Sequence, residues 1–191
     1  MAAQQERPVG CFRAPWRQLF LAAFSLPMFL QTCAAADAHL EYSVKAAFLL
    51  NFTKFVEWPQ TAFADPQAAL EICVSGKNPF GSALEEVVRG EAVNGHTLAV
   101  REIGQAPPPA TCKVLFVGPD VKDPARLLGS VAHGVLTVGE EERFLRDGGM
   151  IALVIDNRRV RFDVNQTAAE NANLKISSKL LSIARKVTGQ P

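Results

Sequence analysis

The sequence predicts an α/β fold: a single domain with a mostly parallel sheet flanked by helices on both faces, and a β-hairpin in its C-terminal half. Apolar strand-like runs alternate with helix-like segments, the pattern of parallel strands joined by helices. The chain has 191 residues and is 48% hydrophobic, which suits one globular domain. Strand-like runs at 150–155 and 160–164, joined by a turn at 156–158, predict the hairpin.

The first half of the domain contains a helix at 41–58, a strand at 70–75, a helix at 80–89 and a strand at 97–103. Pro59 ends the first helix because a residue before proline avoids the helical region. Asn78 and Pro79 suit the cap and first turn of the second helix. Asn94-Gly95 is a turn signal before the next strand.

The second half contains, before the hairpin, a strand at 113–117, a helix at 124–132, a strand at 134–138 and a helix at 140–146. The proline-rich stretch 105–111 predicts a stiff, extended connection into this half. Gly148-Gly149 breaks the helix that precedes the hairpin. Helical sequence from 166 to 187 closes the chain.

Residues 1–38 are predicted to be a secretory signal peptide, cleaved near 36/37 or 38/39, so that the folded domain is 39–191. The pattern is a basic start, an apolar run and small residues: Arg7, Arg13 and Arg17, then 19–30, then 34–36. The apolar run is shorter than the roughly 20 residues of a membrane span. An uncleaved anchor is one alternative; lipidation at Cys33 is another, disfavoured by Thr32. The sequence predicts a periplasmic protein.

The first helix is apolar on most sides. Its most apolar face is predicted to hold Val44, Ala47, Phe48, Phe52 and Phe55. Asn51 lies at the margin of this face, where it either satisfies a buried carbonyl or lines a pocket or interface. Trp58 either packs in the core or serves as a binding hot spot.

Charge and motifs exclude several classes of function. Lys and Arg total 20 against 19 for Asp and Glu, so no basic surface for nucleic acid is predicted. His39, His96 and His133 show no metal-binding spacing, and no catalytic serine motif is present. We therefore predict no metal site, no cofactor and no enzymatic activity. The loop at 75–78 lacks the Ser or Thr of a phosphate loop, and anion binding at this loop is kept as an alternative to an ordinary turn. Glu140 to Glu142 are predicted to cap a helix.

Two cysteines remain after signal-peptide removal, Cys73 and Cys112. Both lie at or near the start of predicted strands, and adjacent parallel strands would bring them together. An oxidising compartment makes the pair a disulfide candidate. Buried free thiols and a redox-sensitive lock are the alternatives.

Several segments together resemble the YfiR family of periplasmic regulators. They are EYSVKAAFLLNFTKFVEWP, NPFGSALE, VNGHTLAVREI, CKVLFVG, VLTVGEEERFLRDGGMIALVIDNRRVRFDVN and NLKISSKLLSIARKV, spanning about 42–187. The resemblance implies an exported, often dimeric α/β protein. Such a protein binds the periplasmic region of a membrane diguanylate cyclase and represses it, which lowers cyclic di-GMP and biofilm formation. It also implies redox dependence: Cys73 and Cys112 match one cysteine pair of the family, whereas a second pair is missing here.

The family pattern also divides the C-terminal segment. Where members have Gly, this chain has Asn173, the next most tolerant residue for a left-handed helix end. We therefore expect a helix at 167–172, an extended stretch at 174–176 and a last helix from a Ser177 cap to about 187. On that helix Leu180, Ile183, Ala184 and Val187 are predicted to pack inward, with Leu181 projecting away.

The resemblance suggests a partner surface near the hairpin and the C-terminal helices, made of Arg158, Arg159, Arg161 and Leu181. A solvated edge strand is the simpler explanation for the arginines. The alternative function is a small-molecule sensing or binding module with an unknown ligand in a cleft at the carboxyl ends of the strands. An uncharacterised hydrolase is a third class.

Overall fold

The computed structural model describes residues 31–63, 65 and 67–189. Most of the predicted signal peptide lies outside these residues, and its last part, 31–38, belongs to helix α1 (Gln31–Phe55). Residues from Asp37 onward form one compact unit. The fold described below is that of this unit.

The main sheet is mostly parallel, as the sequence predicts, and includes two strands that were not predicted, β3 and β10. In the described part of the chain it has eight strands, in the order β10-β8-β7-β6-β5-β2-β4-β3. The strands are β2 (Leu70–Ser75), β3 (Ala92–Val93), β4 (His96–Gly104), β5 (Cys112–Val117), β6 (Leu136–Glu140), β7 (Ile151–Asp156), β8 (Arg159–Asn165) and β10 (Lys186–Thr188). Neighbours are parallel except β3 with β4 and β7 with β8. The mostly parallel sheet and the hairpin are confirmed.

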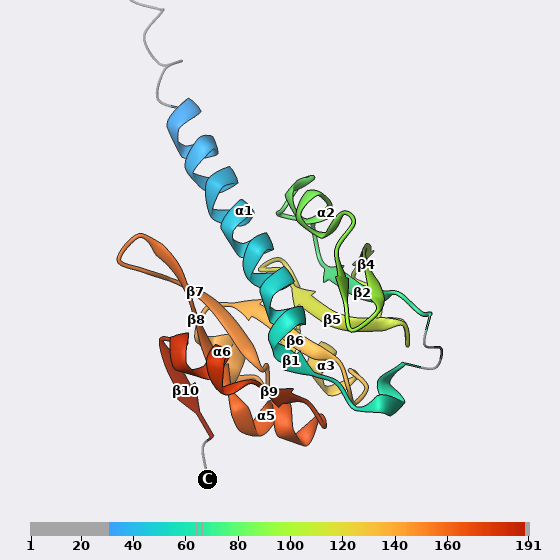
Figure 1. Cartoon of the computed structure of the whole chain (residues 1–191). Coiled ribbons are helices and arrows are strands. Elements are labelled where there is room, and N and C mark those ends of the chain that lie inside the picture. Colours follow the sequence, from blue (N-terminus) through green and yellow to red (C-terminus); the bar gives the residue numbers. More distant parts are fainter. Residues whose placement is uncertain (1–30, 64, 66, 190–191) are drawn as a thin grey trace, which may run out of the picture. The chain divides into compact units, whose positions relative to one another are not determined.

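Helices cover both faces of this sheet. Besides α1 they are the 3-10 helix η1 (Gln60–Ala62), α2 (Ala83–Val88), α3 (Pro124–Gly129), α4 (Arg143–Arg146), α5 (Gln166–Asn171) and α6 (Ser178–Ile183). The larger apolar core joins one sheet face to α1, α2, α5 and α6, and α1 crosses this face in Figure 1. The smaller core joins the other face to α3 and α4.

Helix α1 ends earlier than predicted. Its last residue is Phe55, and Val56–Glu57 form a short strand, β1, which pairs with β9 (Lys175–Ile176). The backbone N–H of Ser177 donates to the carbonyl oxygen of Phe55 at 3.0 Å. The prediction followed Pro59, but pairing with a segment more than a hundred residues away ends the helix first.

The buried face of α1 also differs from the predicted one. Ala46, Leu49 and Phe52 are fully buried, whereas Val44 and Ala47 are exposed. The prediction of a buried Asn51 is wrong, because this residue is exposed. Among the described residues, the charged side chain that α1 buries is Lys45, which is 3% exposed. An ion pair, described below, makes this burial possible.

The C-terminal segment divides where predicted but ends differently. Asn173 has a φ of 62°, which confirms the left-handed position. Helix α6 ends at Ile183 rather than near 187, and the chain continues as β10, parallel to β8. Ile183 is 58% exposed, while Leu181 packs against the main core, which reverses the two predicted orientations.

An ion pair fixes the last strand to the sheet. The carboxylate of Asp163 on β8 is 1% exposed and accepts a hydrogen bond of 2.8 Å from Nε of Arg185. The same guanidinium also pairs with Glu142. The sequence prediction of a continuous helix did not include this contact. Arg185 reaches Asp163 because the helix has ended and the backbone at Ala184 is extended.

Candidate functional site

The sheet has a topological switch point between β2 and β5. From β2 the chain moves outward to β4, and it then crosses to the other side of β2 to form β5, β6 and β7. The loops that follow β2 and β5 therefore begin side by side at the carboxyl ends of the strands. Open α/β sheets bind ligands at this place.

The two switch-point loops are packed tightly against each other. The backbone N–H of Lys77 donates to both carboxylate oxygens of Asp120 at 3.0 Å. Gly76 has a φ of +83°, and a Cβ there would lie 2.3 Å from Oδ1 of Asp120. The proposed anion position of the loop at 75–78 is thus filled by a carboxylate of the protein itself.

Asn78 stabilises the same loop rather than capping α2 directly. Its side-chain oxygen accepts from the N–H of Phe80 at 2.8 Å, and its amide donates to Glu102 at 2.7 Å. Helix α2 begins later than predicted, at Ala83. The extra residues of the loop bring Pro79 and Phe80 close to His39 and Tyr42 of α1.

A buried charge cluster holds α1 to this edge of the sheet. Nζ of Lys45 lies 3.0 Å from a carboxylate oxygen of Glu140 and 2.6 Å from one of Glu41. The Tyr42 hydroxyl donates to the other oxygen of Glu140 at 3.4 Å. Burial, with help from Glu140, raises the pKa of Tyr42 to about 12, so the hydroxyl keeps its proton at neutral pH.

The prediction that Glu140 caps a helix is therefore wrong. Glu140 is the last residue of β6, and α4 begins only at Arg143. Sequence reasoning missed Lys45 and Glu140 as a pair because 95 residues separate them. A lysine within an otherwise apolar helix was the available signal.

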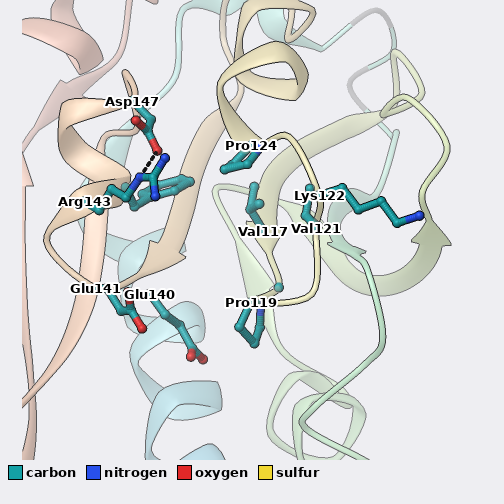
Figure 2. Close-up of a pocket in the computed structure, with 11 residues that line it drawn as sticks. Val117, Pro119, Val121, Lys122, Pro124, Glu140, Glu141, Arg143 and Asp147 are labelled. Atoms are coloured by element: carbon teal, nitrogen blue, oxygen red, sulfur yellow. Dashed lines mark ion pairs between the residues drawn. The ribbon is translucent and has the colours of Figure 1, made fainter.

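Two cavities flank this cluster. The smaller, about 250 Å³, lies between the end of β5 and the start of α4. Figure 2 shows Arg143 and Asp147 as an ion pair on one side, Val117 and Pro119 on the other, and Glu140 near Pro119. The larger, about 680 Å³, lies between residues 38–42 of α1 and the two switch-point loops. We call it the switch-point cavity; its walls include His39, Tyr42, Lys77, Pro79, Phe80, Pro119 and Asp120.

A third cavity, about 780 Å³, is a groove between α1 and the β7–β8 hairpin, which extends beside α1 in Figure 1. We call it the hairpin groove. Its apolar lining is Leu40, Val44, Phe48, Ile155 and Val160. Leu40, Val44 and Ile155 are 64%, 38% and 52% exposed, which is unusual for large apolar side chains gathered at one place.

Charges of opposite sign border the hairpin groove. Asp37 and Glu41 lie along the α1 side, and Arg158 and Arg159 lie at the hairpin side. Arg158 has a φ of 60°, next to Asn157 with a φ of 49°. A two-residue hairpin turn with both residues in this region strongly favours glycine at the second position. An arginine is present there despite the cost of a left-handed backbone, about 1 to 2 kcal/mol.

The structure separates the other predicted site residues from the hairpin groove. Arg161 is exposed and directly opposite Val154, which belongs to the smaller core on the other sheet face. Leu181 packs at the margin of the main core from α6. Trp58 also packs against the main core, and its Nε1 is buried without a hydrogen-bond partner among the described residues. Of the predicted partner residues, the structure brings Arg158 and Arg159 together.

Cys73 and Cys112 form a disulfide between the adjacent strands β2 and β5, with their Cα atoms 5.9 Å apart. Both residues are 0% exposed. The smaller core covers them, with Leu127 and Leu128 of α3 packed against it. The predicted pairing is confirmed, and the bridge is shielded from solvent.

The described residues contain no group of three or more His, Cys, Asp or Glu side chains arranged to hold a metal ion. Within the same residues, no helix has both the length and the apolar character required to cross a bilayer.

Fold and site together define a doubly wound α/β domain with open cavities on its surface. The chain belongs to the YfiR/HmsC-like family, whose model matches residues 42–185. This confirms the resemblance seen in the sequence. The family is periplasmic and regulatory rather than catalytic, and it suggests a role in cyclic di-GMP signalling.

Among solved structures, the chain is similar to a conserved domain protein from Vibrio cholerae O1 biovar El Tor strain N16961, with 11% identity and a TM-score of 0.52. The match covers 77% of this chain but only 60% of that one. It is also similar to the ABC domain in complex with L-Trp from Streptococcus pneumonia, at 13% identity and a TM-score of 0.40, covering 62% and 55% of the two chains. The first likeness shows a shared fold.

Proposed function

We propose that this protein is a non-enzymatic regulator that binds the periplasmic region of a membrane diguanylate cyclase and holds the cyclase inactive. Repression lowers cyclic di-GMP and biofilm formation. Family membership supports the regulatory class and the pathway. The hairpin groove supports the choice of binding surface, because it gathers exposed apolar side chains between two charged borders.

The lining of the hairpin groove supports a partner segment with both apolar and charged residues. Apolar side chains of the segment lie against Leu40, Val44 and Ile155, which exclude water from the contact. A basic residue of the segment faces Glu41, and an acidic residue faces the two arginines. Repression follows if this surface binds the inactive arrangement of the cyclase more tightly than the active one.

A pair of isoleucines provides a matched test of this surface. Ile155 in the groove is 52% exposed, and Ile183 on α6 is 58% exposed. We expect Ile155→Asp to weaken binding of the periplasmic region at least about tenfold, as for a central interface residue. Ile183→Asp should leave the affinity unchanged. Biolayer interferometry measures both, and equal affinities for the two variants would exclude the groove.

Arginine variants provide a second test. Arg158→Gly should raise the free energy of unfolding by about 1 kcal/mol, because glycine favours the left-handed turn, yet it should weaken cyclase binding. Arg159→Glu should also weaken binding. Arg161→Glu, at a residue that does not line the groove, is the control. Weakening by Arg161→Glu alone would assign the contact to a surface outside the groove.

In the predicted homodimer, a second copy of the chain could occupy the same groove in place of the cyclase. Analytical ultracentrifugation of the purified protein distinguishes the two. A dimer that Ile155→Asp dissociates would make the groove a contact between two copies and would overturn the proposed cyclase contact.

A further inference from the structure

The first turns of the compact unit in α1 form a wall shared by two cavities. His39 and Tyr42 line the switch-point cavity, whereas Leu40 and Val44 line the hairpin groove. Residues 37–40 are exposed on every side, so the core does not fix their position. A contact on one flank of this helical segment therefore also restricts the position of the side chains on the other flank.

We propose that the switch-point cavity is a binding site for a small, uncharged aromatic molecule, and that its occupation tightens partner binding in the hairpin groove. The proposed effect on partner binding, the coupling part, rests on the proposed function. The proposed binding of a small molecule, the binding part, does not. The cavity is separate from the groove and lies at the place where doubly wound sheets bind ligands.

The walls of the cavity indicate the class of ligand. Its volume of about 680 Å³ is within the usual range for small-molecule sites, roughly 300–1,000 Å³. The ring of Tyr42 packs edge-on against Phe80 with centroids 5.6 Å apart, and Pro79 and Pro119 add flat apolar surfaces. Such walls favour a planar aromatic ring system.

Charge at the cavity indicates a neutral molecule. Lys77 and Asp120 contribute one positive and one negative side chain, and the carboxylate of Asp120 already accepts from the backbone of Lys77. A charged ligand would gain from one of these groups and lose to the other. A neutral molecule with an amide or hydroxyl group can hydrogen-bond at this rim without that penalty.

The route between the two cavities is short. A ligand that contacts Tyr42 touches the same side chain that donates to Glu140, and Glu140 in turn pairs with Lys45 on the next turn of α1. Occupation adds contacts to the flank of α1 opposite the hairpin groove. It thereby holds Leu40 and Val44 in the arrangement that forms the groove wall, which raises affinity for a segment that needs this wall.

The binding part is tested by titrating the purified, 15N-labelled protein with 2-naphthamide and following backbone amide signals by NMR. Saturable shifts at Gly76, Lys77 and Gly81 are expected, and 2-naphthoate and 2-naphthylmethylamine, which share the ring system, should bind more weakly. Absence of saturable shifts at these amides, or tighter binding of either charged probe, would overturn the assignment.

Two exposed prolines supply matched variants. Pro119→Glu places a charged side chain in the cavity wall, whereas Pro107→Glu makes the same change outside it. We expect Pro119→Glu to weaken 2-naphthamide binding at least tenfold and Pro107→Glu to leave it unchanged. Equal effects of the two variants would place the probe elsewhere.

The coupling part is tested by measuring cyclase affinity with and without saturating 2-naphthamide. We expect about tenfold tighter binding with the probe, within the range usual for coupled sites. If the cyclase region binds with unchanged or lower affinity, the coupling is wrong and the proposed function stands. If the cyclase region fails to bind in either condition, the proposed function is wrong, and the NMR titration still decides the cavity.

Discussion

Lys45 and Glu140 form an ion pair that is almost completely buried, with Nζ and Oε1 3.0 Å apart and side chains 4% and 14% exposed. It joins the middle of α1 to the carboxyl end of β6. Because Lys45 also pairs with Glu41 and Tyr42 hydrogen-bonds to Glu140, both carboxylates and the ammonium have partners. This contact determines where α1 meets the sheet edge that carries the candidate sites.

Lys45→Met should lower the free energy of unfolding by about 3 kcal/mol, because it leaves the Glu140 carboxylate buried without its cation. Urea denaturation measures the change. The matched control is Lys54→Met, whose ion pair with Glu91 has side chains 39% and 40% exposed. An exposed pair contributes less than about 1 kcal/mol. Equal losses in the two variants would show that the burial of Lys45 has no special role.

The sequence predicted the order of elements well but not this ion pair. Strand periodicity and turn residues are local signals, and they located β2, β5 and the hairpin closely. Lys45 and Glu140 lie far apart in the chain, so no local pattern connects them. For the same reason the buried face of α1 was predicted to include Val44 and Ala47, with Asn51 at its margin, although the sheet packs against the neighbouring stripe that contains Lys45.

The C-terminal end shows a second limit of local reasoning. Leu180, Ile183, Ala184 and Val187 have helical spacing, so a continuous helix was predicted. Two remote contacts end it instead: the edge of β8 accepts β10, and Asp163 binds Arg185. By contrast, Asn173 was predicted correctly because a left-handed helix end depends on the residue itself.

Asn173→Ala should lower the free energy of unfolding by about 1 kcal/mol, since alanine tolerates a φ of 62° less well than asparagine. The N–H groups of Asn173 and Leu174 donate to Glu170 and Ala169 at 2.9 Å, which holds this backbone in place. Asn171→Ala, two residues earlier within α5, is the control and should be neutral or slightly stabilising. Thermal denaturation of both variants decides between these outcomes.

Glu71 should make the stability of the fold sensitive to acid. Hydrogen bonding from Arg101 lowers the pKa of Glu71 below its usual value of 4.5. The folded-state pKa is the lower one, so the stabilisation is present above pH 4.5 and is lost as the pH falls through the folded-state pKa. Glu71→Gln should therefore be less stable than the original protein at neutral pH, with a difference that shrinks toward pH 3.

Urea denaturation at a series of pH values measures this difference. Arg101→Gln should reproduce it, because that variant removes the main cause of the pKa shift. A constant difference between Glu71→Gln and the original protein across the series would contradict the assignment.

The Cys73–Cys112 bridge should contribute about 4 kcal/mol to stability, as the chain-entropy relation gives for cysteines 39 residues apart. Both cysteines are fully buried, so we expect dithiothreitol to reduce the bridge only in unfolded molecules. The test counts thiols in native and urea-unfolded protein, in a Cys11→Ser, Cys33→Ser background. Rapid reduction of the native protein would instead support a redox lock that releases the cyclase.

Strand β10 is the last element of the described residues, and Arg185 directly before it is the partner of the buried Asp163. Until residues 185–188 have left the ribosome, the β8 edge has no neighbouring strand and the buried carboxylate of Asp163 has no cation. Folding of this unit is therefore completed only by the most C-terminal of its described residues. A premature stop codon ahead of Arg185 should leave a product that proteases remove instead of a shortened but working protein.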